Sequence, residues 1–130
     1  IVYDQPNAPA GALADAGSSW ADPIDDFARA GGVVIVMSSG AGRAEMDEFL
    51  EGAGLLSVST ETDFSFQVAY NRAPADIVGA NVVTPFVALY ESCTMTTSAV
   101  PDADTVFVVS DTAPGDGIGN PVVIHRILEP

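Results

Sequence analysis

The chain has 130 residues, 48% of them hydrophobic, which is enough for one buried core and one domain. Eighteen Asp and Glu residues stand against four arginines and no lysine, and the formal net charge of −14 argues against DNA or RNA as a partner. The only cysteine is Cys93 and the only histidine is His125, so a disulfide framework within the chain is excluded and a structural zinc site nearly so.

The first half of the chain predicts two helices around a buried strand. Residues 7–17 have no apolar period and predict a loop. The apolar residues that follow recur at three- and four-residue spacing and predict a helix over residues 19–30, with Pro23 in its first turns. The β-branched run 33–37 predicts a strand covered on both faces in a parallel sheet, and residues 43–51 predict a second helix.

The second half predicts a series of short strands. Residues 55–60 and 64–70 predict two strands around a turn at 61–63, and alternation places Phe64 and Phe66 on the same side of the second strand. Further strands are expected at 86–90, 94–98, 106–109 and 122–127, with an exposed loop at 111–120. This order of elements predicts an α/β layer whose last strands are partly antiparallel.

Several segments also carry a resemblance to a known family. Residues 20–36, with their Gly-Gly turn, residues 49–56, and the later segments 82–86 and 121–126 resemble class I glutamine amidotransferase-like domains. The resemblance covers most of the chain. It implies a single domain over residues 1–130 with a three-layer αβα, flavodoxin-like fold and a mostly parallel sheet. The first residues look like the end of a strand, so we expect a first strand or a leader to precede them.

The same resemblance implies where catalytic residues would stand. Active members of the family hold a nucleophilic cysteine on a tight strand-to-helix elbow, with small residues two positions to either side, and a histidine base after a late strand. The elbow-like loop here holds Ser38 and Ser39, while Cys93 has Glu91 and Met95 at the positions that should be small. The resemblance therefore implies a non-catalytic branch of the family.

The one thiol and the one imidazole of the chain form the first candidate site. Cys93 and His125 could meet in a compact domain as a nucleophile and its base. The simpler interpretation is a small buried cysteine and an unrelated histidine on a strand, because unpaired cysteines are among the most buried residue types.

The loop at 38–43 is the second candidate, because it follows the predicted strand and opens the predicted helix. Its backbone amides and the helix dipole could hold an anion, and the ligand-binding candidates are Ser39, Gly40, Gly42 and Arg43. A cap and turn would use the same residue types, and Glu45 stands where a dinucleotide fingerprint needs a small residue. Ser38 or Ser39 is also an alternative nucleophile.

A third candidate lies around the last strands, which Asp102, Asp104, Asp111 and Asp116 bracket. The segment 111–120, with Asp111 and Asp116, could wrap a hard cation with carboxylates and carbonyls. The segment lacks the spacing of the twelve-residue calcium loop and its closing glutamate. An ordinary acidic turn is the alternative.

These observations predict a non-catalytic binding or assembly module of a bacterial envelope or secreted protein, without a cofactor. The acid-rich, lysine-free composition is typical of a secreted or periplasmic setting, and also of solubility in salt, of cation coordination or of a well-solvated surface. The alternatives are a hydrolase or amidotransferase-like enzyme that uses Cys93 with His125, and an acidic cation-binding surface protein. The expected partner is a protein or a small molecule, and no apolar run is long enough to span a membrane.

Overall fold

The computed structural model describes residues 1–3, 5, 7–38, 46–90, 92–97 and 104–129. Two helices come first, α1 (Ala12–Arg29) and α2 (Met46–Gly52). Six strands follow: β1 (Val58–Asp63), β2 (Val68–Asn71), β3 (Phe86–Val87), β4 (Cys93–Thr97), β5 (Thr105–Ser110) and β6 (Pro121–Arg126). Neither helix in this described part of the chain is apolar enough over a sufficient length to cross a bilayer.

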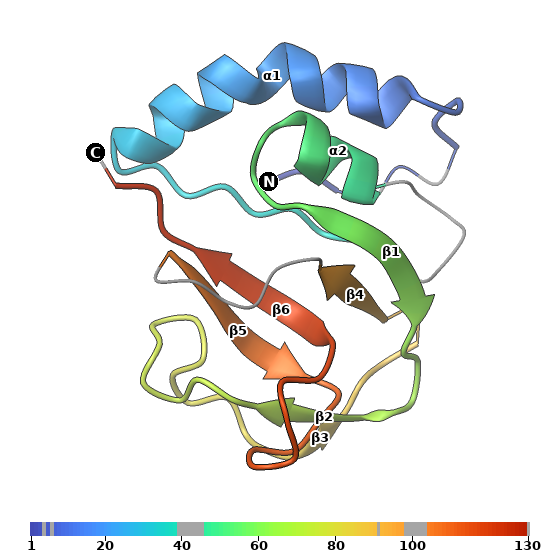
Figure 1. Ribbon diagram of the computed structural model, residues 1–130, viewed down its shortest axis with the longest axis vertical. Coiled ribbons are helices and arrows are strands. Elements are labelled where there is room, and N and C mark those ends of the chain that lie inside the picture. The colour runs from blue at the N-terminus through green and yellow to red at the C-terminus, as the bar shows by residue number, and fades with distance from the viewer. Residues whose placement is uncertain (4, 6, 39–45, 91, 98–103, 130) are drawn as a thin grey trace.

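The strands form two small antiparallel sheets. β1 pairs with β4, and the second sheet has the order β3-β2-β5-β6. In Figure 1 the helices lie at one end of the molecule, β1 and β4 come next, and β2 and β3 lie at the opposite end. Among the described residues, parallel pairing is confined to one bridge between Val2 and Val36.

The predicted three-layer αβα, flavodoxin-like fold with its mostly parallel sheet is wrong. Parallel neighbours need a crossover of about a dozen residues or more, usually a helix. No helix follows α2 in the part of the chain that the structure describes, so no crossover helix connects the strands there. The consecutive strands β2 and β3, and likewise β5 and β6, pair as antiparallel neighbours instead.

The apolar run at 33–37 is covered on one face, and the prediction of a strand buried on both faces is wrong. Val34 and Val36 pack against the cluster of buried residues that α1 and α2 form. Val33, Ile35 and Met37 are exposed, with 76% of Val33 accessible to solvent. The run therefore alternates between core and solvent, as a strand does when nothing covers its outer face.

Helix α1 begins at Ala12, so the loop predicted over 7–17 is wrong in its second half. Alanine is the strongest helix former, and this alanine-rich segment needs no wide apolar stripe to be helical. The earlier start places Pro23 inside the helix rather than in its first turns. Proline has no N–H for the carbonyl of Ser19, and Ser19 lies at an exposed position where water can reach it.

Two glycines allow α1 and α2 to pack closely. A Cβ added to Gly17 would overlap the carbonyl oxygen of Phe49, and a Cβ added to Gly52 would lie 2.7 Å from the carbonyl oxygen of Ala14. Close backbone approach therefore brings the apolar side chains of the two helices together. The buried residues of this first cluster are Leu13, Ile24, Met46, Phe49 and Ala53.

The second half of the chain confirms several predicted strands and moves one turn. β5 and β6 confirm the strands expected at 106–109 and 122–127, whereas the strand expected at 86–90 is reduced to β3. The turn predicted at 61–63 is wrong, because these residues end β1 and the chain turns at 65–66. The buried residues of this second cluster are Phe64, Ala69, Ala88, Val108 and Val109.

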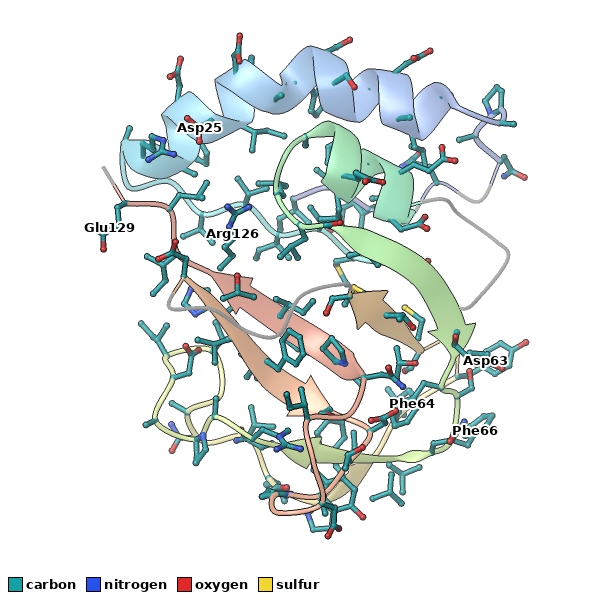
Figure 2. The ribbon with its side chains drawn as sticks, in the orientation of Figure 1. Asp25, Asp63, Phe64, Phe66, Arg126 and Glu129 are labelled. Atoms are coloured by element: carbon teal, nitrogen blue, oxygen red, sulfur yellow. The ribbon has the colours of Figure 1, made fainter. Side chains whose placement is uncertain are left out.

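The three described arginines connect separate parts of the fold through backbone carbonyls. Arg126, at the end of β6, donates to the carbonyl of Gly54 at 2.9 Å, and Figure 2 shows it between the strands and the helices. Arg72 donates to the carbonyl of Thr112 at 3.2 Å, and Arg29 donates to a carbonyl near the last residues of the chain. These guanidinium groups thus serve the fold, in a chain that is otherwise acidic.

Candidate functional site

A tight turn after β1 interrupts the run whose alternation predicts a continuous strand. The carboxylate of Asp63 accepts hydrogen bonds from the backbone N–H of Ser65 at 2.9 Å and from its hydroxyl at 2.6 Å. The N–H of Gln67 donates to the carbonyl of Phe64 at 3.2 Å and closes the turn. An aspartate that binds the backbone two residues ahead is a recognised turn former, and this local chemistry overrides the alternation.

Phe66 occupies a strained position in this turn. Its φ is 61°, a region that costs a bulky L-residue about 1–2 kcal/mol. Its side chain is 67% exposed, whereas that of Phe64 is 4% exposed, and Figure 2 shows Phe66 pointing away from the strands. Burial of the ring therefore does not offset the strain. Persistent strain of this kind is concentrated at functional positions.

Tyr90 lies against Phe66 on the neighbouring segment. The two ring centroids are 5.9 Å apart at an interplanar angle of 35°, and Tyr90 is 65% exposed. Backbone hydrogen bonds hold the two segments in register: the N–H of Phe66 donates to the carbonyl of Ala88 at 3.1 Å, and the N–H of Ala88 donates to the carbonyl of Gln67 at 2.8 Å. The aromatic pair thus stands on a backbone that both segments fix.

Apolar side chains continue this exposed surface along β2 and β3. Val68 and Val87 are direct cross-strand partners, and both are exposed, while the adjacent Ala69 and Ala88 are buried. Leu89 is exposed as well. We define the aromatic edge as the set of Phe66, Val68, Val87, Leu89 and Tyr90. Contiguous exposed apolar side chains of this kind mark interaction surfaces more often than isolated ones do.

The charge around the aromatic edge is negative. The segments 61–71 and 86–97 contain no Arg or Lys, and Asp63 is an exposed acid among their described residues, whereas the carboxylate oxygens of Glu61 are buried. Hydrogen bonds from the hydroxyl and the backbone of Ser65 lower the pKa of Asp63, which is therefore ionised at neutral pH. Figure 2 shows Asp63 and Phe66 on the same side of the molecule. The edge therefore combines aromatic rings with a nearby carboxylate.

Of the residues singled out in the sequence, His125 has the most informative contact. Its Nδ1 lies 2.9 Å from Oδ2 of Asp76, and this hydrogen bond lowers the pKa of Asp76. The sequence does not indicate Asp76, because it lies 49 positions away and belongs to no motif with His125. Cys93 begins β4, pairs with Asp63 in the β1–β4 ladder and is 6% exposed.

The acidic loop at 111–120 is held together by Asp111. Its Oδ1 accepts hydrogen bonds from the backbone N–H of Asn120 at 2.7 Å and from the hydroxyl of Thr112 at 2.8 Å. Its Oδ2 accepts one from the side-chain amide of Asn120 at 3.0 Å. Burial opposes ionisation of Asp111, but these bonds and one from Ser110 outweigh it and lower its pKa. Asp111 therefore has a structural role in this loop.

The other cation and anion candidates are less informative. Asp104 and Asp116 are exposed, and Asp102 lies outside the described residues. Within the described ranges, no group of three or more His, Cys, Asp or Glu side chains is arranged to hold a metal ion. Ser38 is partly buried, whereas Ser39, Gly40, Gly42 and Arg43 lie outside the described residues.

Comparison with protein-family models, with curated proteins and with solved structures finds no match for this chain. The resemblance to class I glutamine amidotransferase-like domains therefore stays a prediction, although the flavodoxin-like fold that it implies is wrong. The aromatic edge is not among the residues that the sequence singles out. Its one local signal was the Asp63-x-Ser65 pair, which is typical of a turn.

Proposed function

We propose that this chain is a non-catalytic binding module and that the aromatic edge is its contact surface. The observation that carries the proposal is Phe66, a phenylalanine held in solvent at positive φ and in contact with the exposed Tyr90. A side chain that contributes little to the core and requires a strained backbone is expected to have another role. Tyr and Phe on a rigid backbone are typical anchors of binding surfaces.

The energetics favour a contact that forms with a partner. Removing a large apolar side chain from water stabilises a complex by about 1.5–3 kcal/mol. The aromatic edge offers five such side chains, and the ladder between β2 and β3 orders its backbone before any partner arrives. Prior ordering reduces the entropy lost on binding. The acid-rich, lysine-free composition supports placing this module in a secreted or bacterial envelope protein.

The test is a selection of peptides that require the aromatic edge. A library of random strand-length peptides on phage is selected on the unmodified chain and counter-selected on the double variant Phe66→Ser/Tyr90→Ser. We expect families of peptides that bind the unmodified chain and lose binding to the double variant. Peptides that bind both proteins alike, or a selection without enrichment, would contradict the proposal.

A matched control removes two exposed apolar side chains from elsewhere. Val33→Ser/Ile77→Ser is suitable because Ile77 is 84% exposed and belongs to neither β2 nor β3. Circular dichroism and thermal unfolding are used to check that both double variants are folded. Selected peptides should bind this control as they bind the unmodified chain.

A second candidate function is a hydrolase, and the hydrogen bond between Asp76 and His125 favours it. A carboxylate that orients an imidazole through Nδ1 is the arrangement that prepares Nε2 to act as a base. Cys93 is the candidate nucleophile. We test this by measuring the rate of Cys93 alkylation by iodoacetamide between about pH 5 and about pH 9. Fast alkylation at neutral pH that slows in Asp76→Asn supports the dyad. Alkylation that stays slow until the pH exceeds the pKa of an ordinary thiol contradicts it.

A further inference from the structure

Resting on the proposed binding role, we infer that the occupant of the aromatic edge is an extended, positively charged polypeptide segment. This segment pairs with the free side of β3 and places Arg or Lys side chains over the rings of Phe66 and Tyr90. The inference combines three features of the described residues: the charge of the surface, the exposed rings and the unpaired side of a terminal strand.

Charge selects the chemistry of the partner. The formal net charge is −14, and the segments that form the aromatic edge contain no Arg or Lys. Among their described residues, Asp63 contributes an exposed carboxylate. The three described arginines donate to backbone carbonyls of the chain itself. Such a surface attracts a basic partner over long range and repels phosphates, anionic lipid and a second copy of the same acidic chain.

The aromatic pair gives this attraction a specific place. Phe66 and Tyr90 are tilted by 35° and both are largely exposed, so each ring offers a face to solvent. A guanidinium or ammonium group is attracted to the face of an aromatic ring, more strongly when the contact excludes water. The ionised carboxylate of Asp63 lies on the same side of the molecule as Phe66 and adds a hydrogen-bond acceptor for the same cation.

The backbone of β3 is suited to an extended partner. β3 is the terminal strand of its sheet, so one of its sides has no neighbour in that sheet. The N–H and carbonyl of Ala88 are used by Gln67 and Phe66. Because successive residues of a strand present their backbone groups to opposite sides, those of Val87 face the unpaired side. A segment added there would form main-chain hydrogen bonds and lay apolar side chains against Val87 and Leu89.

The test uses four short synthetic peptides with a fluorescent label. In three of them valine alternates with arginine, glutamine or glutamate. The fourth is the arginine peptide with methylated amides on alternate residues, which blocks one hydrogen-bonding side. Binding is measured by fluorescence anisotropy at physiological and at raised salt, on the unmodified chain, on Phe66→Ser/Tyr90→Ser and on Val33→Ser/Ile77→Ser.

The expected result is tighter binding of the arginine peptide than of the glutamine peptide by about tenfold, with no binding of the glutamate peptide. The affinity of the arginine peptide for Phe66→Ser/Tyr90→Ser should be about tenfold lower than for the unmodified chain. Its affinity for Val33→Ser/Ile77→Ser should be unchanged. Methylation should weaken binding to the unmodified chain, and raised salt should weaken it further.

The other outcomes separate this inference from the proposed function. Equal binding of the arginine peptide to the unmodified chain and to Phe66→Ser/Tyr90→Ser would reduce the contact to general charge attraction and overturn the inference. If the glutamine peptide binds as well as the arginine peptide and still requires Phe66 and Tyr90, the binding role stands and the basic partner is wrong. Equal binding of the methylated peptide overturns pairing with β3.

Discussion

The helical end of the molecule and the aromatic edge use their apolar residues in opposite ways. At the helical end, Gly17 and Gly52 let two backbones approach closely, and the large side chains of both helices are buried. At the aromatic edge, a strained turn holds the ring of Phe66 in solvent. The first arrangement stabilises the fold, whereas the second adds strain without burial. Hydrophobicity alone therefore does not indicate the role of a residue.

The largest difference in stability is expected between variants of two phenylalanines, Phe64 and Phe66, that stand two positions apart. Phe64→Ala should destabilise the chain by about 3–5 kcal/mol, because it removes a buried ring from the second cluster. Phe66→Ala should change the free energy of unfolding by less than about 0.5 kcal/mol, as is usual for exposed positions. Urea denaturation of both variants measures the two values. Equal losses would mean that Phe66 belongs to the core and would end the contrast between the regions.

The next effect concerns the contact between the helices. Gly→Ala inside a helix ordinarily stabilises a protein by about 1 kcal/mol. Gly17→Ala should instead destabilise this chain by about 2 kcal/mol, because the added Cβ overlaps the backbone of Phe49. Urea denaturation measures the change in unfolding free energy, and a gain in stability for Gly17→Ala would contradict the close contact between the helices. Gly11→Ala is the control for backbone strain alone, since its φ is 76° and nothing lies within 4 Å of the added Cβ. It should lose about 1 kcal/mol.

A smaller effect of opposite sign is expected at the strained turn. Phe66→Gly should stabilise the chain by about 0.5–1 kcal/mol, because glycine adopts positive φ without the clash that a Cβ causes. Thermal unfolding measures the gain. The same variant should bind more weakly the peptides that require the aromatic edge. A gain in stability together with a loss of binding would be the expected signature of strain retained for function, and a loss of stability would contradict it.

The smallest effect is pH-dependent and concerns the loop that Asp111 holds. The pKa of Asp111 is lowered in the folded chain, so its ionised form contributes stability that is complete above the unfolded value of about 3.9. This contribution is lost as the pH falls through the folded value. The gap in unfolding free energy between the unmodified chain and Asp111→Ala should therefore narrow as the pH falls from about 6 to about 3. Asp116→Ala, which removes an exposed carboxylate from the same loop, is the control variant.

Local patterns predict much of the second half. The strands at β5 and β6 and the loop between them follow from short apolar runs and from turn residues that act over a few positions. The turn at 65–66 is not predicted, because the apolar alternation over 64–70 indicates a continuous strand, whereas the Asp63-x-Ser65 pair forms a turn. Helix α1 is placed too late because an alanine-rich segment carries no wide apolar stripe. These errors concern which of two local signals prevails.

Composition gives the net charge of −14, and local pattern predicts the helices before the strands and most strand positions, because each pattern depends on residues close together in the chain. Three further features depend on neighbours distant in sequence: the antiparallel sheets, the single covered face of 33–37 and the contact of His125 with Asp76. The aromatic edge belongs with these. Its rings meet because backbone bonds join the turn after β1 to the segment after β3, and its exposure depends on one φ angle that the residue type alone disfavours.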